Sequence, residues 1–128
     1  MFTQNTWLHE AAWDSAPANI RRVRAFVSDC LHRHGLVRVE AECLLVATEL
    51  ATNAVMHTRM PFSVAVCQDA GAVLILVHDL APGTVDLRQT GSAADRGRGL
   101  FVVGQISIEW GVNDDEDGLG KTVWARIA

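Results

Sequence analysis

Hydrophobic side chains recur at helical spacing in the first third of the chain. Ser15 and Pro17 are typical of a helix start, and Gly35 is typical of a helix end. Between them, apolar residues return every three or four positions: Ile20, Val23, Val27, Cys30 and Leu31. This spacing predicts an amphipathic helix.

A second helix is predicted from Val37 to His57, and it must end before Pro61, which cannot continue it. Apolar residues point in almost every direction around this helix: Val39, Cys43, Leu44, Leu45, Val46, Leu50, Val55 and Met56. A helix that is apolar nearly all round is normally buried. We therefore expect it to lie at the centre of the domain.

The remaining elements are short strands, one loop and one short helix. Segments rich in β-branched residues and bounded by turn signals predict strands, and the turn Asp69-Ala70-Gly71 predicts a hairpin. The predicted strands are residues 3–13 at an edge, 62–68, 73–78, 108–112 and 121–127, with a Gly-rich loop over 82–98 and a helix over 100–106. Helices gathered on one face of a mostly antiparallel sheet give an α+β fold, a two-layer α/β sandwich.

Composition narrows the class of protein. The chain of 128 residues is 49% hydrophobic and 20% charged, which fits a single globular domain over residues 1–128. A net charge of -4 argues against direct binding of nucleic acid. No apolar run is long enough to span a membrane, and no signal peptide is visible, so we expect a cytoplasmic protein without a membrane partner. The three cysteines are expected to be buried thiols: Cys30, Cys43 and Cys67.

The second predicted helix carries a polar stripe. Glu42, Glu49, Asn53 and His57 fall within an arc of roughly 80° when successive residues are 100° apart. On a buried helix such a stripe needs partners. A polyanion with a hydrated cation would use the amide oxygen for the metal and a carboxylate for proton transfer. The alternative is an ordinary solvated helix edge.

Two motifs near the C-terminus are weak. The segment 118–122 contains a Gly-Lys-Thr sequence, but Asp115 stands where a P-loop needs its first glycine, and a strand follows instead of a helix. Residues 113–118 resemble the start of a calcium loop, yet Trp124 occupies the position of the bidentate glutamate. A solvated hairpin turn is the better interpretation.

A third motif precedes the predicted short helix. Gly97 and Gly99 flank Arg98 directly before Leu100. Two glycines at a helix start would let backbone N–H groups and the arginine approach a phosphate. The alternative is an ordinary helix start.

Taken in order, four motifs of the chain resemble one family. They are Glu49-x-x-x-Asn53-Ala54-x-x-His57, then Asp79-Leu80-Ala81-Pro82, then Gly97-Arg98-Gly99-Leu100, then Gly120-Lys121-Thr122-Val123-Trp124. The chain is similar to the Bergerat-fold ATPases of the GHKL superfamily, and more narrowly to the small anti-sigma-factor serine/threonine kinases and their single-domain ATP-binding relatives. The resemblance implies the Bergerat ATP-binding fold, with ATP and Mg²⁺ as cofactors.

The resemblance also implies roles for single residues. Glu49 would be the catalytic carboxylate, and Asn53 the Mg²⁺ ligand next to the ATP phosphates. His57 would line the same helix end. Asp79 would accept a hydrogen bond from the adenine amine, with support from Thr122.

The other implied nucleotide contacts lie around the predicted loop. Residues 83–96 would form a lid over the triphosphate, and its phosphate-facing end would be Gly97, Arg98, Gly99 and Leu100. Ala81 stands where the superfamily commonly has a glycine, and would narrow the approach to the adenine face.

Two function classes follow from the resemblance. The first is a kinase that phosphorylates a serine or threonine of a protein antagonist, in a pathway that releases or captures a sigma factor. The second is a nucleotide-responsive binding module that transfers no phosphate. The partners would be a sigma factor, an antagonist protein or both, and the resemblance leaves homodimer formation open.

Overall fold

The computed structural model describes residues 6–80 and 101–128. In chain order the elements are β1 (Leu8–Trp13), α1 (Asn19–Arg33), the 3₁₀ turn η1 (Val37–Val39), α2 (Glu40–His57), β2 (Phe62–Asp69), β3 (Ala72–Asp79), β4 (Glu109–Asp114) and β5 (Lys121–Ile127). Residues 101–106 are also helical. The predicted loop over 82–98 lies outside the described residues.

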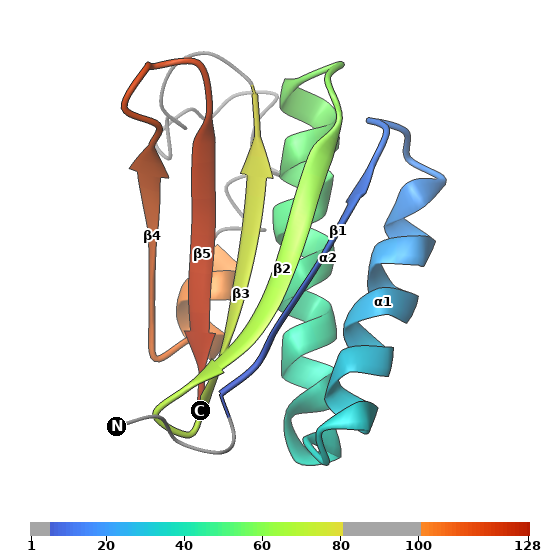
Figure 1. Ribbon diagram of the computed structural model, residues 1–128, viewed down its shortest axis with the longest axis vertical. Coiled ribbons are helices and arrows are strands. Elements are labelled where there is room, and N and C mark those ends of the chain that lie inside the picture. Colours follow the sequence, from blue (N-terminus) through green and yellow to red (C-terminus); the bar gives the residue numbers. More distant parts are fainter. Residues whose placement is uncertain (1–5, 81–100) are drawn as a thin grey trace.

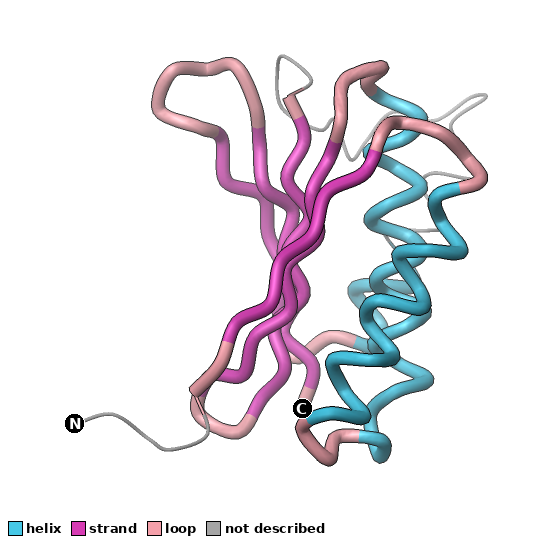
Figure 2. Tube along the Cα trace, turned by 45° about the vertical axis from the view of Figure 1, so that its right-hand side comes forward, coloured by secondary structure: helices cyan, strands magenta, loops and turns pink. Residues whose placement is uncertain are grey.

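The strands form one sheet in the order β1-β2-β3-β5-β4, and every neighbouring pair is antiparallel. Figure 1 shows α2 behind β1 and β2 and α1 to the right of β1, and the turned view in Figure 2 shows both helices on the same side of the sheet. The predicted two-layer α/β sandwich with helices on one face is confirmed. The predicted edge strand is confirmed over Leu8–Trp13, where β1 pairs with β2 at one end of the sheet, while residues 6–7 precede the strand.

The core lies between α2 and the sheet. Leu50 of α2 is almost fully buried, as are Val64, Ile75 and Val77 on the inward face of β2 and β3. Side chains alternate along β3 and β5, so that every second residue faces the helices. This alternation decides which polar side chains can reach a site beside α2.

The predicted helices are confirmed, with one difference at a helix start. Ser15 does not cap the first helix, because α1 begins at Asn19 and has no side-chain cap. The Ser15 hydroxyl instead lies within hydrogen-bonding distance of the carbonyl oxygens of Val55 and Thr58, at 3.2 and 2.5 Å. These carbonyls belong to the end of α2, where the last turn leaves acceptors without helical partners. Ser15 therefore fixes the end of the helix that carries the polar stripe.

The predicted hairpin is confirmed and turns at Ala70 and Gly71. Both residues have positive φ, 52° and 85°, as a tight two-residue turn requires.

The cysteines are free thiols. Cys30 and Cys43 are buried, as predicted, while Cys67 is half-buried. Burial raises the pKa of Cys43 to about 12, so this thiol stays protonated at neutral pH.

Among the described residues, no helix is long and apolar enough to cross a membrane.

Candidate functional site

Three segments meet at one end of the sandwich. The C-terminal half of α2, the end of β3 and the start of β5 all lie at the top of Figure 1. Helix α2 packs against both β3 and β5. The residues of these segments that lie where α2 meets β3 and β5 can therefore form one site.

The polar stripe of α2 lies on the side of that helix away from α1. Thr48 marks the side towards α1, because Arg24 of α1 donates a hydrogen bond to its hydroxyl at 2.7 Å. Asn53 is five residues further along and is rotated from Thr48 by roughly 140° around the helix axis. This rotation turns Asn53 away from the side of α2 that meets Arg24.

Asn53 is the most informative member of the stripe. It is only 8% exposed, and its side chain makes no hydrogen bond to any other residue in the described part of the chain. The other buried polar residues, Asn19, Asp79 and Lys121, each have a hydrogen-bond partner. Among the described residues, Ser107 Oγ is the one fully buried side-chain polar atom without a partner, so the amide atoms of Asn53 keep access to solvent and can be reached from outside. Asn53 is therefore suited to contact a ligand.

Glu49 and His57 lie on the same side of α2 and are half-buried. Glu49 is one helical turn before Asn53, which places the two Cβ atoms about 6 Å apart. His57 is the last residue of the helix. The structure thus keeps a carboxylate, an amide and an imidazole in a row, as the sequence predicted.

Asp79, the last residue of β3, forms a buried ion pair with Lys121, the first residue of β5. Lys121 Nζ lies 2.8 Å from Asp79 Oδ1, and each side chain is 3% exposed. The two residues are paired across the strands and face the helical layer. A buried pair of charges is stable only with good geometry and further hydrogen bonds.

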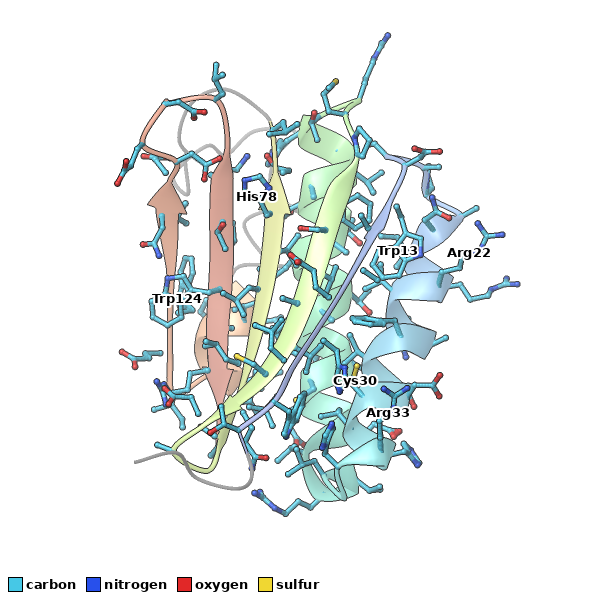
Figure 3. All side chains as sticks on the ribbon, viewed as in Figure 1. Trp13, Arg22, Cys30, Arg33, His78 and Trp124 are labelled. Atoms are coloured by element: carbon cyan, nitrogen blue, oxygen red, sulfur yellow. The ribbon has the colours of Figure 1, made fainter. Side chains whose placement is uncertain are left out.

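Close packing of the turn between β4 and β5 fixes this pair. A Cβ atom on Gly120 would lie 2.7 Å from the Asp79 carbonyl oxygen. His78 Nε2 lies 2.9 Å from Asp115 Oδ2, which ties the same turn to β3, and Figure 3 shows His78 near the upper end of that strand. The backbone N–H of Asp115 donates to the Gly120 carbonyl at 2.9 Å. These contacts confirm a hairpin turn in this segment.

The expected role of Thr122 remains a prediction, and the structure shows only where the residue lies. Its cross-strand neighbour is His78, and alternation along β5 turns it to the sheet face away from the helices. Lys121, its neighbour in the chain, is the residue beside Asp79. Lys121 Nζ is the group seen in direct contact with the Asp79 carboxylate.

Five predicted nucleotide contacts fall outside the described residues: Ala81, Gly97, Arg98, Gly99 and Leu100. Their roles remain predictions.

A surface groove of about 550 Å³ lies elsewhere, between α1 and α2. Its lining includes Arg24, Glu40 and Leu44 but no residue of the polar stripe that the sequence predicted. The groove is therefore separate from the candidate site.

Sequence reasoning missed Lys121. One signal was available, because Lys121 begins the apolar series Val123, Ala125 and Ile127 that faces the core. A lysine in such a series is either exposed at the strand end or paired with a buried acid. Naming Asp79 as that acid needed the register between β3 and β5.

Comparison with known protein families matches residues 13–127 to the histidine kinase-like ATPase domain, HATPase_c_2. A search of curated proteins found no match. The matched segment covers nearly the whole chain and includes α2, β3 and β5. The protein therefore belongs to the histidine kinase-like ATPase domain family.

Proposed function

We propose that this protein binds ATP and Mg²⁺ at the site between α2, β3 and β5, and that it is a regulatory serine/threonine kinase of the anti-sigma-factor type. Its substrate is an antagonist protein, and a sigma factor is its other partner. Family membership supports ATP binding. The observation that carries the proposal is the Asn53 amide, which lies on a mostly buried residue, keeps access to solvent, has no hydrogen-bond partner among the described residues and lies one turn from Glu49.

Asn53 fits the role of a Mg²⁺ ligand. Mg²⁺ prefers oxygen ligands and keeps several waters when phosphates supply the rest. No cluster of three or more His, Cys, Asp or Glu side chains in the described ranges could hold a metal by itself. We therefore expect Asn53 to bind Mg²⁺ only together with the ATP phosphates. When bound, the cation neutralises charge on the phosphates during transfer.

Glu49 has the chemistry of a general base. In the proposed reaction its carboxylate accepts the proton of a serine or threonine hydroxyl on the partner. The hydroxyl oxygen forms a bond to the γ-phosphorus of ATP, the bond from that phosphorus to the β–γ bridging oxygen breaks, and ADP leaves with the electron pair. Positioning of this kind accounts for most of the catalysis in phosphoryl transfer.

Replacing Glu49 by glutamine tests the proposal. The variant keeps the size and hydrogen-bonding capacity of the side chain but removes the base. The purified protein is incubated with ATP, Mg²⁺ and candidate antagonist proteins, and phosphoserine and phosphothreonine are measured by mass spectrometry. We expect ATP affinity to change little and phosphoryl transfer to fall by roughly 100-fold or more.

Glu42→Gln is the matched control, because Glu42 lies on the same stripe two turns earlier and is also half-buried. It should leave transfer unchanged. A wild-type protein that binds ATP and its partner but never phosphorylates it would contradict the kinase proposal and favour the nucleotide-responsive binding module.

A further inference from the structure

The buried ion pair at the end of β3 places a lysine beside the carboxylate that is proposed to bind the base. In the function proposed above, Asp79 accepts a hydrogen bond from the exocyclic amine of adenine. The structure adds a cation directly beside that carboxylate, with Lys121 Nζ 2.8 Å from Asp79 Oδ1. Any ligand group that reaches Asp79 also meets Lys121.

The hydrogen bonds of Lys121 are incomplete. An ammonium group has three N–H donors, and Asp79 is the one acceptor that Lys121 Nζ has among the described residues. The side chain is 3% exposed, so solvent has little access to the remaining donors. A buried cation is stabilised only when its other protons also find acceptors. A ligand acceptor next to the Asp79 carboxylate would meet this requirement.

The position of Lys121 is fixed by the backbone around it. Gly120 packs against the Asp79 carbonyl oxygen, and the register sets Asp79 opposite Lys121. The two side chains therefore present an acceptor and a donor next to each other.

The adenine ring carries the complementary pattern. Its N6 amine is a donor, and its neighbouring ring nitrogen N1 is an acceptor. Guanine has the opposite arrangement, because O6 is an acceptor and N1–H is a donor. In the same orientation, guanine would oppose its oxygen to Asp79 and its N–H to the Lys121 ammonium.

We propose that Lys121 is a second base-specificity residue, which donates a hydrogen bond to adenine N1 while Asp79 accepts one from the N6 amine. This inference rests on the proposed ATP site and assigns one atom of the ligand to one atom of the protein. Under this assignment, Asp79 and Lys121 together select adenine.

The test compares ATP with 1-deaza-ATP, in which a C–H group replaces N1 and the amine is kept. Affinities are measured by calorimetry for the wild type and for Lys121→Met. For the wild type we expect 1-deaza-ATP to bind about 10- to 100-fold more weakly, as for loss of a hydrogen bond to a charged group. For Lys121→Met the two nucleotides should bind equally well.

Two controls accompany this comparison. Arg126→Met removes a cation from the far end of the same strand, where Arg126 pairs with Asp69 and Glu109, and should keep the wild-type preference for ATP. 7-Deaza-ATP, altered on the opposite edge of the base, should bind the wild type like ATP. If Lys121→Met does not fold, equal binding of ATP and 1-deaza-ATP to the wild type would still overturn the assignment.

Equal binding of ATP and 1-deaza-ATP to the wild type would overturn the assignment of Lys121 while leaving the ATP site intact. An equal penalty in the wild type and in folded Lys121→Met would do the same. Absence of any ATP binding to the wild type would instead remove the proposed function itself.

Discussion

Gly120 packs against Asp79 so closely that a Cβ atom would lie 2.7 Å from the Asp79 carbonyl oxygen. The same atom would lie 2.7 Å from Asp115 Oδ2. Both distances are shorter than a carbon and an oxygen normally approach, and the carbonyl cannot move without shifting the strand. Glycine at this position thus allows β5 to pair with the end of β3 and to place Lys121.

Gly120→Ala should therefore destabilise the protein by about 1–3 kcal/mol, the usual cost of overpacking. Urea unfolding followed by circular dichroism measures this. Gly104→Ala is the control, because among the described residues its Cβ would meet the Trp110 side chain alone, at 3.3 Å, and alanine favours the helix there. Equal unfolding midpoints for Gly120→Ala and the wild type would show that the contact is not tight.

A second prediction concerns how stability depends on pH through the histidine pair near the start of β1. His9 Nε2 and His34 Nε2 lie 2.9 Å apart, and Trp7 stacks on His34 with ring centroids 3.9 Å apart. Burial, followed by the charges of His9 and Arg33, holds the pKa of His34 below its usual value.

Because the folded pKa is the lower one, the unfolded chain binds a proton at His34 more readily. Stability should be complete above the ordinary histidine pKa of about 6.5 and should fall as the pH drops below it. Urea unfolding at a series of pH values should show a shallower acid loss for His34→Gln than for the wild type. Identical pH profiles for the two proteins would rule out a contribution from His34.

A third prediction separates ligand binding from stability at Asn53. Asn53→Ala should remove the dependence of ATP affinity on Mg²⁺ and weaken binding in Mg²⁺ roughly 10-fold or more. The fold should persist, because the side chain has no hydrogen bond to the rest of the described structure. Calorimetry with and without Mg²⁺, together with thermal unfolding, tests both statements.

Thr52→Ala is the matched control, since Thr52 is the half-buried neighbour on α2 outside the stripe, and it should retain the Mg²⁺ effect. If Asn53→Ala unfolds while the wild type shows no Mg²⁺ effect, Asn53 has a structural role instead.

Local patterns predicted the elements well because each pattern depends on neighbours in the chain. Apolar spacing gave α2, and the turn at Ala70 and Gly71 gave the hairpin between β2 and β3. The assignment of Ser15 as a helix start was wrong because its hydroxyl bonds to carbonyls about 40 residues away. The sequence around Ser15 does not show whether its hydroxyl bonds to the helix that follows it or to a distant one.

The site was predicted in part for the same reason. The polar stripe of α2 follows from helical geometry, so Glu49, Asn53 and His57 were found together. The partner of Asp79 is 42 residues away in the chain. The two residues meet only because β3 pairs with β5, and no local pattern reports that pairing. The motif pointed to Thr122, and the strand register adds Lys121 as a residue in contact with Asp79.

The most direct test of the account is a calorimetric titration of the wild-type protein with ATP and with GTP in the presence of Mg²⁺. Asp79 and Lys121 match the adenine edge and oppose the guanine edge, so ATP should bind at least about 10-fold more tightly than GTP. Equal affinity for the two nucleotides, or no binding at millimolar ATP, would contradict the central claim that this site recognises adenine.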